Sequence, residues 1–224
     1  MSKLVLVPTP VGNLEDITLR ALRILKEAEV IFSEDTRVTK KLLDHFDVSK
    51  KCLPFHAHNE HRFLEKSIEI IKNSSLVVLV SDAGTPGISD PGFLLVRACI
   101  HHDILVECLP GPTAFVPALV GSGFPCDKFV FEGFLPHKKG RQTRLKLLSQ
   151  EDRTIVMYES PHRLLKKLEQ MADFFEPSRE VCVVREISKM FETYHRGNLE
   201  ELTSYFKQTA PKGEIVLLIK GLED

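Results

Sequence analysis

The sequence predicts an α/β protein of two domains, the first with a mostly parallel sheet and the second with a mixed sheet. Short β-branched runs alternate with amphipathic stretches along the chain, which is typical of strands covered by helices. Leu76–Val80 is apolar at every position, as expected of a strand buried on both faces. The last three strand-like runs are joined too closely for all of them to be parallel. The 224 residues are enough for two domains with separate cores.

The first half alternates strands and helices in regular order. The predicted strands are Lys3–Val7, Val30–Ser33, Cys52–Phe55, Leu76–Val80 and Ile104–Leu109. Helical spacing predicts one helix through Ile17, Ala21, Ile24 and Ala28, one over 36–46, one through Leu64, Ile68 and Ile71, and one over 93–101. Asn13 is placed to cap the first of these helices. Strands connected by helices in this way form a parallel sheet.

The second half uses the same elements less regularly. Its predicted strands are Phe129–Phe131, Ile155–Tyr158, Val181–Val184, Phe191–Arg196 and Glu214–Ile219. Its predicted helices are a stripe of Leu164, Leu168, Met171 and Phe175, and a segment over Leu199–Phe206. Glycine and proline are concentrated between Asp82 and Pro125, and we place the domain boundary in the last part of that region. The predicted domains are therefore 1–122 and 123–224.

Composition excludes several classes of protein. With 30 Lys and Arg against 31 Asp and Glu, the net charge of −1 excludes a polybasic coat for nucleic acid. No apolar run approaches the roughly 20 residues of a membrane-spanning helix, and the N-terminus has no secretory apolar region. The five cysteines form no CxxC pair and no zinc spacing. We expect a cytoplasmic protein with reduced cysteines and no membrane association.

Polar or Gly/Pro-rich loops follow all five strands of the first half. Because ligands bind beyond the carboxyl ends of parallel strands, these loops predict one binding site. The loops are 8–13, 33–37, 56–61, 81–92 and 110–114. None matches a P-loop, a GxGxxG fingerprint or a nucleophile elbow. His56, His58 and His61 lack Cys partners and HExxH spacing, so we expect no metal.

These loop sequences carry a resemblance to a known family. The motifs are Pro8–Leu14, Glu34–Arg37, Ser81–Gly92, Pro110–Ala114, Glu132–Pro136, Tyr158–Arg163 and Lys212–Glu214. In their order and spacing the chain resembles the tetrapyrrole methylase superfamily, and within it a branch that methylates RNA of the small ribosomal subunit. The corrin methylases of the superfamily usually carry Gly-Asp-Pro where this chain has Ser81-Asp82-Ala83.

The resemblance implies a homodimeric methyltransferase that binds S-adenosylmethionine in a cleft between its two domains. The branch methylates the ribose 2′-hydroxyl of one cytidine in the decoding region of 16S rRNA. By position, the implied cofactor-binding residues are Thr9, Pro10, Asp82, Gly84, Thr85, Thr113, Ala114, Met157, Tyr158, Arg185, Glu186, Lys212 and Gly213. Many members continue into a C-terminal extension, and we expect any RNA contact that it supplies to be absent or replaced in this sequence. A tetrapyrrole or corrin methylase and a non-catalytic ribosome-assembly module are the alternatives.

Methyl transfer to a hydroxyl requires placement of the acceptor and removal of its proton. The candidate catalytic residues are Glu34, Asp35, His58 and Glu159, with His56 and Asp82 as further candidate bases. Each has a structural alternative. Asp35 can pair with Arg37 or cap a helix at Thr36, and Asp82 can hold backbone or cofactor. Glu159 can accept from the N–H groups of a helix that begins near Pro161.

RNA contact requires cations near the site, because the phosphate backbone dominates affinity. The segment from 137 to 146 holds five Lys or Arg and no acid. The candidate RNA-binding residues are Arg37, Lys138, Lys139, Arg141 and Arg144. The alternative for such a run is a solvated helix face.

Overall fold

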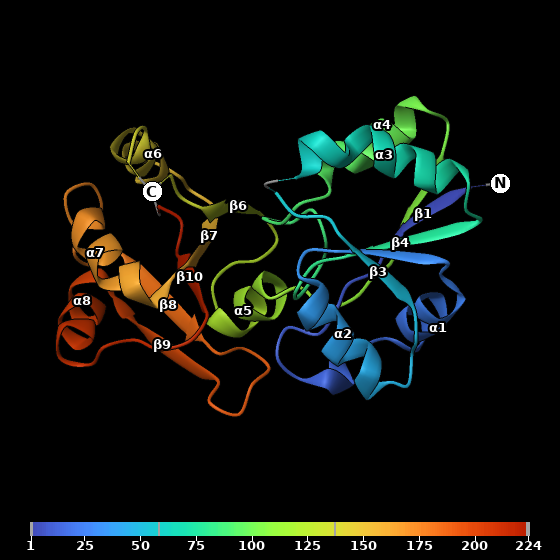
Figure 1. Ribbon diagram of the computed structural model, residues 1–224. Helices are drawn as coiled ribbons and strands as arrows, with labels where there is room; N and C mark the ends of the chain where they lie inside the picture. The colour runs from blue at the N-terminus through green and yellow to red at the C-terminus, as the bar shows by residue number, and fades with distance from the viewer. Residues whose placement is uncertain (1, 58, 137, 223–224) are drawn as a thin grey trace. The chain divides into compact units, whose positions relative to one another are not determined.

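The computed structural model describes residues 2–57, 59–136 and 138–222. The chain divides into two compact units between Thr113 and Ala114, and each unit is described by itself (Figure 1). None of the helices in the described part of the chain is long and apolar enough to span a membrane.

The first unit contains a five-stranded parallel sheet, as predicted. Its strands are β1 (Lys3–Leu6), β2 (Val30–Ser33), β3 (Lys51–Pro54), β4 (Leu76–Val80) and β5 (Leu105–Cys108), in the order β3-β2-β4-β1-β5. Its helices are α1 (Leu19–Glu27), α2 (Thr36–His45), α3 (Glu60–Lys72) and α4 (Phe93–His101), and a 3-10 turn, η1, spans Leu14–Asp16. The carboxyl ends of all five strands therefore lie at one edge of the sheet.

Both faces of this sheet are buried, because successive side chains of a strand point to opposite faces. Val5 and Val78 belong to the core under α1 and α2. Leu4 and Val77, one residue away on the same strands, belong to the core under α3 and α4. Figure 1 shows these two helix pairs on opposite sides of the sheet.

The second unit contains a mixed sheet, again as predicted. Its strands are β6 (Phe129–Phe134), β7 (Thr154–Glu159), β8 (Glu180–Arg185), β9 (Thr193–Asn198) and β10 (Ile215–Ile219), in the order β6-β7-β10-β8-β9. Only the β6–β7 pair is parallel. The helices are α5 (Phe115–Ser122), α6 (Arg141–Leu148), α7 (Pro161–Met171) and α8 (Leu199–Gln208). Apolar residues of α6, α7 and α8 share one core with one face of the sheet.

The structure differs from the prediction in two details. Asn13 caps the turn η1, because its side chain accepts from the Glu15 N–H, and Thr18 is the residue that caps α1. The division of the chain falls after Thr113, ahead of the boundary predicted between 122 and 123. Helix α5 packs with the second sheet, where the Phe115 ring centroid lies 4.6 Å from that of Phe131.

Candidate functional site

The loops after β1 and β4 are tied together at the carboxyl edge of the first sheet. The Thr9 N–H donates to the Gly84 carbonyl at 2.9 Å, and the Gly84 N–H returns the bond at 2.9 Å. The Thr9 hydroxyl also donates to the Ser81 carbonyl at 3.2 Å. Gly84 has a φ of +79°, a conformation that favours glycine. The two predicted loops thus form one fixed structure, with Thr9 only 2% exposed.

The loop after β5 joins the same structure. The Thr85 hydroxyl donates to the Pro112 carbonyl at 3.0 Å and lies 2.5 Å from the Thr113 hydroxyl oxygen. Gly111 lies against Pro8, such that a Cβ at Gly111 would come within 2.7 Å of the proline ring. These contacts bring four cofactor candidates together: Thr9, Gly84, Thr85 and Thr113.

Carboxylates gather at the ends of β2 and β4. The Asp35 N–H donates to Oδ1 of Asp82 at 2.9 Å, so Asp82 holds backbone, which was its structural alternative. Burial raises the pKa of Glu34, and the charge of Asp82 raises it further, while His56 opposes the change. Burial also raises the pKa of Asp90 to about 7, with Glu34 as the next cause. Burial, with charge repulsion as a smaller cause, therefore favours retention of a proton by Asp90 near neutral pH.

The Asp35 side chain has a structural role at the start of α2. Its side chain caps α2 by accepting from the Arg37 N–H at 2.8 Å, and Oδ2 accepts from Nη2 of Arg37 at 2.6 Å. The hydrogen bonds from Arg37 lower the pKa of Asp35 to about 2. His58, another candidate, lies outside the described residues.

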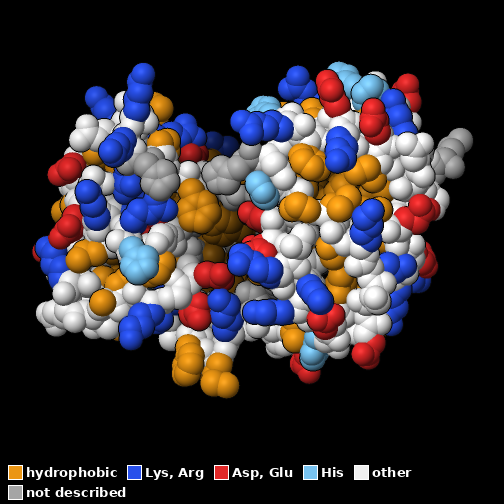
Figure 2. Space-filling model, in the orientation of Figure 1, with side chains coloured by type: hydrophobic (Ala, Val, Ile, Leu, Met, Phe, Trp, Pro, Cys, Tyr) orange, Lys and Arg blue, Asp and Glu red, His pale blue; other side chains and the backbone are white. Residues whose placement is uncertain are grey.

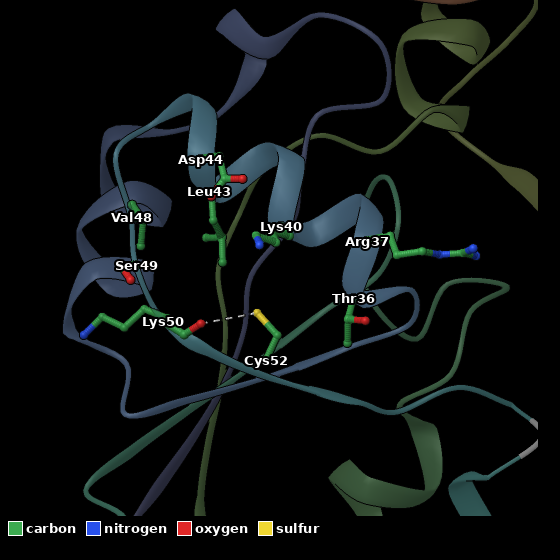
Figure 3. Close-up of a pocket in the computed structure, with 9 residues that line it drawn as sticks. All are labelled: Thr36, Arg37, Lys40, Leu43, Asp44, Val48, Ser49, Lys50 and Cys52. Carbon is green, nitrogen blue, oxygen red and sulfur yellow. Dashed lines mark hydrogen bonds between the residues drawn. The ribbon is translucent and has the colours of Figure 1, made fainter.

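A pocket of about 440 Å³ lies beside α2 and the segment leading to β3 (Figure 3). Its lining combines three cations, one acid and apolar side chains: Thr36, Arg37, Lys40, Leu43, Asp44, Val48, Ser49, Lys50 and Cys52. Figure 3 shows the Arg37 side chain extending away from the other lining residues, and this side chain is 86% exposed.

Pro10 and Asp82 lie in the first unit with the four candidates of the tied loops, while the candidates Tyr158, Arg185 and Lys212 meet at one edge of the second sheet. Tyr158 pairs with Val216, and Arg185 pairs with Ile215, so the ends of β7 and β8 lie beside the start of β10. Nε of Arg185 donates to the Lys212 carbonyl at 2.9 Å. Met157 precedes Tyr158 on β7 and is fully buried. Ala114, assigned to the same set, is the N-cap residue of α5.

Glu186 and Gly213 fit closely together at this edge. Glu186 has a φ of +52°, which is unusual for a residue with a side chain. It is held there because its N–H donates to the Glu214 carbonyl at 2.9 Å, while the Glu214 N–H donates to Oε1 of Glu186 at 2.8 Å. A Cβ at Gly213 would lie 2.2 Å from the Glu186 carboxyl carbon. Strained backbone held by its surroundings is typical of functional sites.

Some residues of the basic segment 137–146 are exposed, and others are buried or bound to an acid. Lys138 and Lys139 are exposed, and Figure 2 shows Lys and Arg side chains gathered over α6. Arg144 binds Glu132 through Nε at 2.8 Å and through Nη2. Arg141 is only 8% exposed, so this RNA-binding candidate does not share the open surface of Lys138 and Lys139. Helical spacing places Arg141 on the same buried face as Leu145 and Leu148.

Glu159 already has a hydrogen-bond partner and a cationic partner. Its Oε1 accepts from the Ser160 N–H at 2.8 Å, as its structural alternative required, and its Oε2 lies 2.8 Å from Nζ of Lys167.

Asp90 was missing from the catalytic candidates, although it stands in the Ser81–Gly92 motif. Among the residues that the structure describes, no group of three or more His, Cys, Asp or Glu is arranged to hold a metal ion.

Known proteins with similar sequences belong to one family of methyltransferases. Residues 3–203 match the family model described as Tetrapyrrole (Corrin/Porphyrin) Methylases. A ribosomal RNA small subunit methyltransferase I from Thermotoga maritima is 44% identical over 223 residues, covering 100% of both chains. A protein of the same name from Escherichia coli O157:H7 is 45% identical over 222 residues, covering 98% of this chain and 78% of its own.

Solved structures share the fold at lower identity. Uroporphyrin-III C-methyl transferase from Thermus thermophilus, complexed with S-adenyl homocysteine, matches with a TM-score of 0.68 at 21% identity, covering 97% of each chain. A diphthine synthase matches with a TM-score of 0.75 at 14% identity, covering 98% of this chain and 90% of its own. The chain therefore belongs to the ribosomal RNA small subunit methyltransferase I family of tetrapyrrole methylases.

Proposed function

We propose that this protein transfers a methyl group from S-adenosylmethionine to the ribose 2′-hydroxyl of a cytidine in 16S rRNA of the small ribosomal subunit. The observation that carries the proposal is the full-length similarity, at 44% identity, to a relative named ribosomal RNA small subunit methyltransferase I. The Tyr158–Arg163 motif, which resembles that branch, supports the RNA substrate over a corrin or tetrapyrrole.

The residues of the first unit suit S-adenosylmethionine. Bound there, the cofactor supplies an activated methyl group on a sulfonium cation. The tied loops at Thr9, Gly84 and Thr113 form a fixed edge built from small residues, which suits a nucleoside. The carboxylates of Glu34 and Asp82 give the same edge a negative charge that favours a cation. The candidates on the second unit stay proposed cofactor ligands.

We assign the general base to Glu34. Its half-buried carboxyl has a raised pKa, so it accepts a proton more readily than an ordinary glutamate. Burial, and after it the charge of Glu34, raises the pKa of Asp90 to about 7, so the two carboxyls act on each other electrostatically. Asp35 and Glu159 are weaker candidates, because Arg37 and Lys167 already neutralise them.

RNA contact is proposed for the exposed basic residues of both units. Arg37 is 86% exposed in its side chain, and Lys138 and Lys139 are exposed before α6. Such side chains reach phosphates without loss of a buried partner. Arg144 contributes less in this proposal, since Glu132 accepts from its Nε and Nη2.

We also propose that the protein acts as a homodimer in the cytoplasm. Figure 2 shows hydrophobic side chains that protrude from the second unit, and Met190 and Phe191 between β8 and β9 are 90% and 71% exposed. Such a surface suits burial against a second copy of the chain. Sedimentation velocity of the parent protein and of a Met190→Ser, Phe191→Ser variant measures this directly.

The methyl transfer is tested with isotopically labelled S-adenosylmethionine and small ribosomal subunits that lack the modification. We expect label in 16S rRNA, and no label when the target cytidine is replaced by 2′-deoxycytidine. Transfer to the deoxy target contradicts the 2′-hydroxyl assignment. Absence of S-adenosylmethionine binding in calorimetry favours the non-catalytic assembly module.

A further inference from the structure

A buried ionic cluster lies in the second unit at the end of β7. Glu159 is 5% exposed and Lys167, on α7, is fully buried. Oε2 of Glu159 lies 2.8 Å from Nζ of Lys167, and Oε1 lies 3.2 Å from Nε of Arg163. One carboxylate thus holds two cations, and its Oε1 also accepts from the Ser160 N–H at 2.8 Å.

A third cation lies near this cluster. Arg141 is only 8% exposed, and its charge acts on Lys167. Burial is the main cause that lowers the pKa of Lys167, Glu159 opposes that effect, and Arg141 and Arg163 add to it. Nε and Nη2 of Arg141 are buried and find no hydrogen-bond acceptor among the described residues. Arg141 therefore lies near a carboxylate that already binds two cations, and a buried cation without an acceptor is unfavourable.

The geometry of Arg141 indicates the kind of ligand that would complete the cluster. Nε and Nη2 lie on one edge of a guanidinium, the edge that holds two oxygens of the same group. On the same helix, Arg144 uses this edge to bind both carboxylate oxygens of Glu132. The corresponding edge of Arg141 is suited to a second oxyanion with two oxygens side by side.

The start of α6 adds to the positive potential. Gly140 precedes the helix with a φ of +85°, its first turn contains no acid, and none of the described side chains caps the helix. Unsatisfied N–H groups and the helix dipole both favour an anion there. The Arg163 side chain is 30% exposed, so the cluster extends to the surface that a ligand approaches.

We propose that Arg141, Arg163 and Lys167 form a binding site for one phosphodiester group of the RNA substrate, in which Glu159 fixes the positions of Arg163 and Lys167. The inference rests on the proposed function, because it takes RNA as the source of the phosphate. A carboxylate of the cofactor has similar chemistry, and the experiment separates the two sources.

The test is the full-length Arg141→Gln variant, measured by binding to a 16S rRNA transcript at several salt concentrations. Loss of a bidentate, charge-assisted contact weakens binding roughly 10- to 100-fold. The slope of log affinity against log salt decreases by about 0.7 to 0.9, the value for one phosphate. The KM for RNA rises by the same factor, kcat stays within about threefold, and calorimetric affinity for S-adenosylhomocysteine is unchanged.

Arg153→Gln is the matched control, since Arg153 pairs with Glu151 just before β7, at the opposite end of the strand from Glu159. If Arg141→Gln does not fold, the partly exposed Arg163→Gln variant carries the same test. RNA affinity within about twofold of the parent in the folded variant overturns the proposal. A loss of S-adenosylhomocysteine affinity without a loss of RNA affinity overturns it as well and assigns the site to the cofactor. A parent protein that binds and methylates no rRNA refutes the proposed function instead.

Discussion

Replacing Asp90 with asparagine is expected to change the pH dependence of stability. In the unfolded chain this carboxyl ionises at its ordinary pKa of 3.8, whereas in the native protein burial and Glu34 raise the pKa to about 7. Between these values the native state holds a proton that the unfolded state has lost, so the free energy of unfolding falls as pH rises from about 4 to about 7. The asparagine side chain has no such proton to lose, and the variant lacks this decrease.

The magnitude follows from the two pKa values. At about 1.36 kcal/mol for each tenfold change in proton affinity, a rise from 3.8 to about 7 corresponds to ~4 kcal/mol. Because the side chain is partly exposed, solvent screening reduces this to about 2 kcal/mol. Relative to the parent, Asp90→Asn is therefore expected to gain about 2 kcal/mol of stability between about pH 4 and pH 7.

Urea unfolding at a series of pH values measures this difference. The exposed Asp44 of α2, changed to Asn, is the control in the same unit. We expect the Asp44→Asn and parent curves to stay parallel while the Asp90→Asn curve diverges upward with pH. Parallel behaviour of all three proteins, within about 0.5 kcal/mol, would refute the raised pKa of Asp90.

Three further predictions concern the site residues. Glu34→Gln is expected to lower kcat by about 10²- to 10⁴-fold in methyl-transfer assays, with S-adenosylhomocysteine affinity in calorimetry close to that of the parent; unchanged kcat contradicts its assignment as the base. Gly213→Ala is expected to destabilise the protein in thermal unfolding and to weaken S-adenosylhomocysteine binding, because its Cβ would overlap a carboxyl group. Gly123 has a similar φ of +83° but lies in open space, so Gly123→Ala should lower stability through backbone strain alone. If both variants lose the same amount of thermal stability, the overlap at Gly213 is not the cause. Lys167→Met is expected to cost about 3–5 kcal/mol in urea unfolding because it breaks a buried ion pair, and Lys167→Met with Glu159→Leu is expected to cost less because the buried carboxylate is removed as well.

The fold was predictable because its signals are local. Leu76–Val80 is apolar throughout, and this alone predicts a strand covered on both faces. Helix α5 was missed because Pro117 and Gly121 lie within it and because residues 115–120 are apolar all round, without a polar face. The Asn13 cap was misassigned because Asn13 and Thr18 both suit a cap and only η1 separates them.

The loops that form the site were predictable from the sequence, but the role of each side chain in them was not. Parallel topology brings the strand ends to one edge, so Thr9, Gly84 and Thr113 were predicted together. The role of Asp90 depends on its proximity to Glu34, which belongs to a different loop and which no local pattern reveals. The burial of Arg141 depends on which face of α6 packs against the core, and a basic run with little amphipathic contrast does not show that.

The position of β10 has a consequence for biosynthesis. This strand lies between β7 and β8 and forms hydrogen bonds with both, although it follows them in the chain. The pairs β6–β7 and β8–β9 therefore remain two separate halves until Ile215–Ile219 has been translated. The first sheet, by contrast, is complete once β5 has emerged. During translation the nascent chain thus completes its first sheet early. In the second sheet, β7 and β8 each keep an unpaired edge until β10 pairs with both.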